Sequence, residues 1–107
     1  MKFTTLVPVN FNDGTKVPQS QIDAILARFW VLFGGCTVEG PVVGHWVNDN
    51  GTHFQDDCLK VWVVADNSRL EDAETLVRQI GAQLHQEAMY FEVEHHPESG
   101  VRILDTK

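Results

Sequence analysis

The chain has 107 residues, a hydrophobic content of 43% and a formal net charge of -7. These values predict one compact domain over residues 1–107, with a core at about residues 3–94 and a tail at 95–107, and they exclude a disordered chain. No apolar run is long enough to cross a bilayer, and residues 1–10 lack the pattern of a signal peptide, so we expect a cytoplasmic protein. The few basic residues are scattered, which disfavours nucleic acid and anionic membranes as partners.

Residues 3–9 are rich in Phe, Thr, Leu and Val and predict a strand, and the Asn, Asp, Gly and Pro of residues 10–18 predict a loop. A helix is expected from about Ser20, with Asp23 in its first turn. Its core-facing positions recur at helical spacing: Ile22, Ile25, Leu26, Phe29, Leu32 and Phe33. Gly34 and Gly35 are typical of a helix C-terminus.

Residues 36–47 and 52–65 predict two strands, joined by Asn50 and Gly51 as a two-residue type I′ turn. Ser68 and Glu71 match a capping box that begins a second helix. Residues 89–93 alternate as a final strand, and the tail predicts a short edge strand. The two cysteines, Cys36 and Cys58, match no metal or redox spacing, so we expect reduced core residues.

This order of elements predicts an α+β fold of the ferredoxin-like βαββαβ type. Right-handed crossovers give a four-stranded antiparallel sheet in the order 4-1-3-2, with both helices on one face. The strand directions also bring the loop at 10–18, the hairpin turn and residues 85–87 to one end of the sheet. We therefore expect Asp13, Gln86 and Glu87 to lie near the hairpin.

A two-residue turn would set His45 opposite Asp56 and place both on the open face of the sheet, with Trp62 and Tyr90 nearby. Trp46 would then point to the helices and anchor the core. A one-residue slip, or a three-residue turn with a bulge, would redistribute these faces. A His-Asp pair can prepare a general base, because the carboxylate raises the pKa of the ring, but such pairs more often only stabilise a hairpin.

Five histidines make a metal site the next candidate. His45 and His53 are expected on opposite faces, and no HxH or HExxH spacing occurs. The sequence therefore predicts no metal ligands, and it carries no cofactor motif.

Three stretches resemble a group of small bacterial proteins of unknown function with a predicted ferredoxin-like fold: NDGTKVP, FGGCTVEGPVVGHW and LHQEAMYFEV. The resemblance covers about residues 3–93. It implies the fold and no activity, and it places Asp13, Gly44, Trp46, Gln86 and Glu87 in the shared motifs.

We favour a non-enzymatic module whose open sheet face forms a homodimer or binds another protein, with a small-molecule ligand as a further possibility. The binding residues would be Asp13, His45, Asp56, Trp62, Gln86, Glu87 and Tyr90. The first alternative is a small enzyme with a His45/Asp56 site near the hairpin. The second is an acidic inhibitor of a basic protein, with ordinary solubility as the simpler explanation of the charge.

Overall fold

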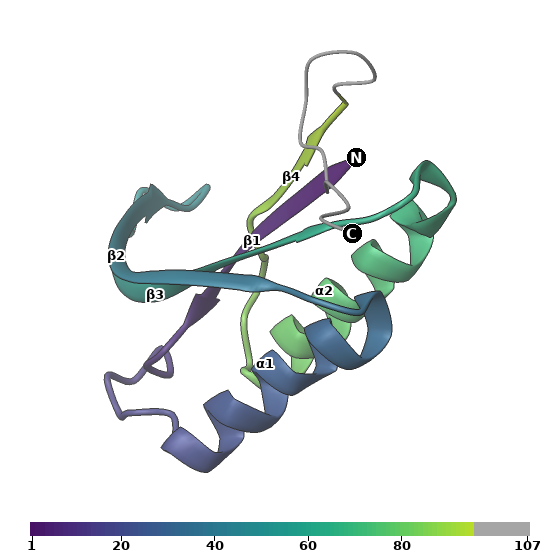
Figure 1. The fold of residues 1–107 in the computed structure, drawn as a ribbon. Helices are drawn as coiled ribbons and strands as arrows, with labels where there is room; N and C mark the ends of the chain where they lie inside the picture. The colour runs from purple at the N-terminus through teal and green to yellow at the C-terminus, as the bar shows by residue number, and fades with distance from the viewer. Residues whose placement is uncertain (96–107) are drawn as a thin grey trace.

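The computed structural model describes residues 1–95, in which four strands and two helices follow one another along the chain (Figure 1). They are β1 (Lys2–Pro8), α1 (Gln19–Phe33), β2 (Thr37–Val47), β3 (His53–Val64), α2 (Leu70–Gln83) and β4 (Phe91–Glu94), and a 3-10 turn (Asn67–Arg69) lies between β3 and α2. The last strand is shorter than predicted, and the edge strand expected in the tail lies outside the described residues. Within residues 1–95, no helix is both long and apolar enough to span a membrane.

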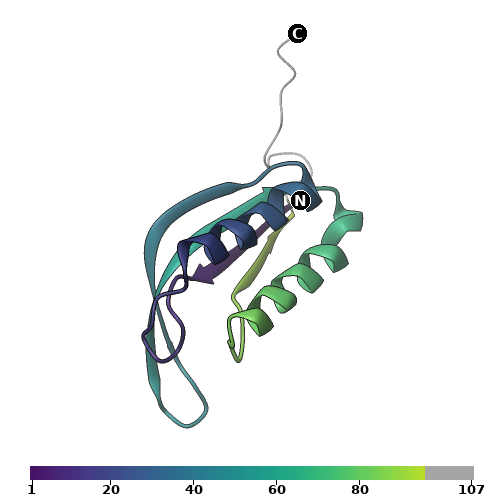
Figure 2. The same cartoon turned by 90° about the horizontal axis from the view of Figure 1, so that it is seen from below.

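The predicted α+β class is confirmed. The sheet order is β2-β3-β1-β4, which is 4-1-3-2 when read from the β4 edge, and all neighbouring strands are antiparallel. Both helices cover the same face of this sheet (Figure 2). The other face, which neither helix covers, is called the open face (Figure 2).

The core forms where alternate strand residues meet the helices. Phe3 pairs with Val63 and Val7 with Leu59, so these side chains share the helix-covered face. They pack with Ile22, Ile25 and Phe29 of α1 and with Ala73, Leu76, Ile80 and Leu84 near α2, all of which are buried. The spacing of these residues explains why both segments form helices with one buried side.

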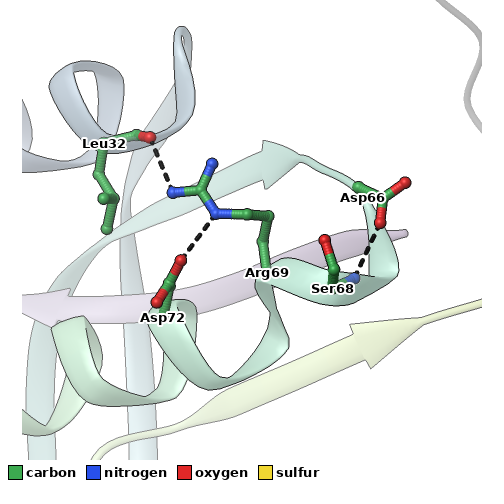
Figure 3. Close-up of polar contacts among 5 residues, drawn as sticks. All are labelled: Leu32, Asp66, Ser68, Arg69 and Asp72. Atoms are coloured by element: carbon green, nitrogen blue, oxygen red, sulfur yellow. Dashed lines mark hydrogen bonds and ion pairs between the residues drawn. The ribbon is translucent and has the colours of Figure 1, made fainter.

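Local polar contacts fix the helix ends. Gly34 ends α1 with φ 81°, and its N–H donates to the carbonyl of Trp30, as the sequence predicts. The capping box prediction is wrong: the carboxylate of Asp66 accepts from the N–H of Ser68, one 3-10 turn before α2 (Figure 3). Arg69 then joins the helices, because it bonds the Leu32 carbonyl at 3.1 Å and the Asp72 carboxylate at 2.7 Å (Figure 3).

The turn between β2 and β3 has three residues instead of the predicted two. The N–H of Gly51 donates to the Asn48 carbonyl at 2.9 Å, and the N–H of Asn48 donates to the Thr52 carbonyl at 3.0 Å. Of the three turn residues, only Gly51 has a positive φ, at 79°, so the turn is type I followed by a left-handed glycine. The Asn48 side chain also accepts the N–H groups of Asn50 and Thr52, which stabilises this longer turn over the two-residue form.

The extra turn residue shifts the pairing by one, and a bulge between Glu39 and Val42 shifts it by one more, which returns Val38 to the helix-covered face. Gly40 within the bulge has φ 137°, and a Cβ there would lie 3.1 Å from the Cys58 carbonyl oxygen, so glycine is required. The bulge inverts which side chains of β2 face the helices. Beyond it the two strands bend away from the helices, toward the open face (Figure 1). We call this bent part, residues 42–58, the hairpin arm.

Candidate functional site

A hollow of about 300 Å³ lies on the open face, where the hairpin arm bends over the end of β1. Its walls come from four segments that are far apart in the sequence. The lining residues are Leu6, Pro8, Gly44, His45, Trp46, Asp56, Cys58, Gln86, Ala88, Met89 and Tyr90. Four of the seven predicted binding residues, His45, Asp56, Gln86 and Tyr90, border this hollow, although the side chain of His45 lies on the other side of its strand.

The floor of the hollow follows from the pleat of β1. Leu6 and Pro8 alternate with the core residues Thr5 and Val7, so they point to the open face. The Thr5 hydroxyl donates to the Tyr90 carbonyl at 2.7 Å and thereby holds the segment before β4 against β1. This hydrogen bond therefore joins β1, which forms the apolar floor, to the segment before β4, which forms the adjacent wall.

The predicted meeting of the first loop with residues 85–87 is confirmed. The Asn12 side-chain amide donates to the His85 carbonyl, and the Gln86 amide donates to Asn12 Oδ1, both at 3.2 Å. The ring of Phe11 lies 6.2 Å from that of His85. These contacts fix Gln86 at the edge of the hollow, while the tip of the hairpin extends past both loops (Figure 2).

The wall from the hairpin arm is aromatic and acidic. Trp46 pairs with Phe54, and their rings stack with centroids 4.3 Å apart and planes 14° apart. The indole N–H of Trp46 donates to Asp56 Oδ2 at 3.0 Å. The prediction that Trp46 anchors the helix-covered core is therefore wrong, because the three-residue turn places this ring on the open face.

The predicted pairing of His45 with Asp56 is also wrong. His45 pairs with Gln55 across the strands and alternates with Gly44 and Trp46, so its ring points away from the hollow. There Nδ1 of His45 lies 3.0 Å from Nε2 of His53. The expectation that these two histidines point to opposite faces fails for the same reason, the shifted register.

Cys58 is the cysteine that borders the hollow, and its side chain is buried. Cys58 is 4% exposed, and burial, with a smaller effect of Asp56 and Asp57, raises its pKa to about 11. Cys36 is partly buried, and burial raises the pKa of its thiol too; both cysteines are free. The thiolate, which is the nucleophilic form, is therefore scarce at neutral pH.

The remaining predicted residues lie elsewhere. The carboxylate of Asp13 is exposed and accepts from both the hydroxyl and the N–H of Thr15, and these bonds lower its pKa. Glu87 borders a different hollow, between α2 and the segment before β4. Trp62 is on the open face as predicted, but it donates to Glu39 at 3.2 Å and contacts Lys2, away from the hollow.

Sequence reasoning missed Leu6, Pro8, Met89 and Phe54. Leu6 and Pro8 could have been found, because the alternation of β1 was visible and both fall on the side opposite Phe3 and Val7. Phe54 depended on the register of the turn. Met89 lies before β4, which begins at Phe91 and not at Met89 as the alternation predicts, so no sequence signal indicates its place beside the hollow.

No protein-family model matches the chain, and no curated protein matches it either. A proposal about function therefore rests on the geometry of the open face. Within residues 1–95, no group of three or more His, Cys, Asp or Glu side chains is arranged to hold a metal ion.

Proposed function

We propose that this domain is a non-enzymatic binding module, and that its ligand is a small organic molecule held in the open-face hollow. The observation that carries the proposal is the convergence of Leu6, Trp46, Asp56 and Gln86, from four separate segments, around one hollow. Ligand sites of this kind are concave, mostly apolar, and carry a few polar groups that fix orientation.

The polar groups in the hollow favour a ligand that donates hydrogen bonds. Asp56 accepts one bond from Trp46, and an ionised carboxylate has acceptor sites for more. The Gln86 side-chain N–H donates to Asn12 and to the Leu84 carbonyl, so its oxygen is the atom suited to a ligand. Two acceptors beside an apolar floor match an amine or amide on an apolar body.

Aromatic rings beside the carboxylate favour a cation among such ligands. Trp46 and Tyr90 both line the hollow, and a cation is attracted to the face of an aromatic ring. The net charge of -7 adds a general attraction for positive ligands. An aromatic or aliphatic amine therefore fits the site better than a carboxylic acid does.

A catalytic function has less support from the same residues. His45 is not oriented by Asp56, and its ring contacts His53 instead. The thiol of Cys58, with its pKa raised to about 11, remains protonated at neutral pH. The hollow therefore brings together groups that recognise a ligand without an activated nucleophile and base.

The test compares two probes that share a body and differ in charge, phenethylamine and 3-phenylpropionate. Each is titrated into the ¹⁵N-labelled protein while NMR follows the amide signals of Gly44, Asp56 and Gln86. We expect the amine to shift these signals in a saturable way and the acid to leave them unchanged. Equal shifts with both probes, or none with either, would refute the proposed ligand class.

Asp56→Asn is the informative variant, because Asn still accepts the indole N–H of Trp46. It should weaken amine binding about fivefold, since a hydrogen bond to a charged acceptor contributes about 1 kcal/mol more than one to a neutral acceptor. Asp57→Asn is the matched control, because Asp57 is exposed and points to the other face of the arm. Equal loss in both variants would mean that general charge, not the hollow, attracts the amine.

The predicted homodimer through the open face would fill the hollow with a second copy. Light scattering on the same sample distinguishes the two occupants. A monomer that binds the amine supports the small-ligand proposal, whereas a stable dimer in which the amine shifts no signal would overturn it.

A further inference from the structure

The outer face of the hairpin arm carries a second feature, a pair of histidines whose rings face each other. Nδ1 of His45 lies 3.0 Å from Nε2 of His53, the ring centroids are 5.2 Å apart, and the planes differ by 12°. Both side chains are exposed. They are diagonal neighbours, because His53 pairs with Val47, two residues after His45 on the same face.

From this geometry we propose that His45 and His53 form a two-ligand site for a divalent transition-metal ion such as Zn²⁺ or Cu²⁺. The contact between the two nitrogens requires that one ring donates and the other accepts. If the donor ring changes to its other tautomer, its proton moves to the ring nitrogen that faces away, and both facing nitrogens can offer a lone pair to one metal ion. Binding to the two neutral rings therefore exchanges one hydrogen bond for two metal–nitrogen bonds, with no net release of a proton.

The distances allow this exchange with little movement. Two Zn–N bonds of about 2.0–2.1 Å at a tetrahedral angle place the nitrogens about 3.3–3.4 Å apart. The rings of His45 and His53 must separate by only a few tenths of an ångström from their 3.0 Å contact. Because both rings are exposed on a strand pair beyond the helices, small side-chain rotations provide that separation.

The ligand chemistry selects the class of ion. Imidazole binds zinc, copper and nickel, whereas magnesium and calcium require oxygen ligands. Since no third His, Cys, Asp or Glu among residues 1–95 joins this pair, water or an external ligand must complete the coordination. The site is therefore suited to reversible binding, and it does not depend on the hollow on the opposite face.

The experiment titrates Zn²⁺ alone into the full-length chain and follows the imidazole signals by NMR, with heat of binding measured in parallel. Asn replaces His95 and His96, which are adjacent in the sequence, so that these two imidazoles do not compete. We expect one ion per chain, with the signals of His45 and His53 changing together, and no response to Mg²⁺.

His45→Asn and His53→Asn should each weaken Zn²⁺ binding by about tenfold or more, since even changes around metal ligands commonly cost 10–100-fold in affinity. His85→Asn is the matched control, because His85 is exposed in another loop beside Phe11, and it should leave the affinity unchanged. The proposal would be overturned if the chain does not bind Zn²⁺ stoichiometrically. It would also be overturned if the variants lacking His45 or His53 bind Zn²⁺ as tightly as the chain that keeps both.

Discussion

Replacing Trp46 tests the arrangement of the hairpin arm, because its side chain makes two separate contacts. Truncating a fully buried Trp to Ala costs about 3–5 kcal/mol, but Trp46 is only partly buried. A hydrogen bond to Asp56 contributes about 1 kcal/mol, and the stacked pair with Phe54 about 0.5–1.5 kcal/mol beyond its buried area. We therefore expect Trp46→Ala to lower the free energy of unfolding by about 2–3 kcal/mol.

The assay is thermal and urea unfolding of matched variants. For a domain of this size, 1 kcal/mol corresponds to about 4–8 °C in Tm, so Trp46→Ala should lower Tm by about 10–20 °C. Val47→Ala is the control, because Val47 is 63% exposed on the other face, and it should change stability by less than about 0.5 kcal/mol. Trp46→Phe keeps a stacked ring and loses the donor, so it should cost about 1 kcal/mol.

Two results would refute this reasoning. A larger loss for Val47→Ala than for Trp46→Ala would mean that the faces of the arm are exchanged. A loss near 5 kcal/mol for Trp46→Ala would mean that the ring belongs to the helix-covered core, as a two-residue turn requires.

Three further predictions concern other parts of the fold. A thiol reagent at pH 8 should modify Cys36 in the native protein while Cys58 stays intact; rapid modification of Cys58 would contradict this. Burial raises the pKa of Cys58 to about 11, so the thiol ionises first in the unfolded chain. The free energy of unfolding should therefore fall as the pH rises from about 9 toward 11. Deleting Asp49 should convert the turn to Asn-Gly with two central residues and leave the strand pairing and Tm nearly unchanged, whereas loss of the cross-strand contacts seen by NMR would show that the longer turn is required. Gly81→Ala should destabilise the fold by about 1–3 kcal/mol, because the new Cβ would lie 2.6 Å from Met89 Cγ. Met89→Ala in the same chain should recover part of that loss. If the stability losses of the two substitutions simply add in the double variant, this contact is not the cause.

The fold was predictable where the pattern of apolar residues had one solution. Ile22, Ile25 and Phe29 recur at helical spacing, and Val61 and Val63 alternate, so the elements and the helix-covered face followed. The strand order then came from the handedness of crossovers. These features depend on many residues at once, so the wrong predicted start of the last strand, at Met89 instead of Phe91, did not change them.

The site was less predictable because it depends on single residues. The side chain of Asn48 stabilises the longer turn by accepting two N–H groups, and that one residue moves His45 away from Asp56. The bulge at Gly40 has an equally local cause. A sequence pattern shows that such positions favour turns or bulges, but not which of two registers their side chains select.

The bulge in β2 has a consequence for how this domain can change over evolutionary time. On its near side Val38 pairs with Val61, a residue that is 1% exposed in the core, and on its far side Val42 and Trp46 belong to the open face. The bulge thereby places the two parts of one strand differently: Val38, itself 40% exposed, lies on the helix side, whereas Trp46 lies on the open face. Under the proposed function, substitutions beyond Gly40 change the wall of the hollow while the pairing of residues 37–39 with β3 stays the same, so the ligand can change without a new scaffold.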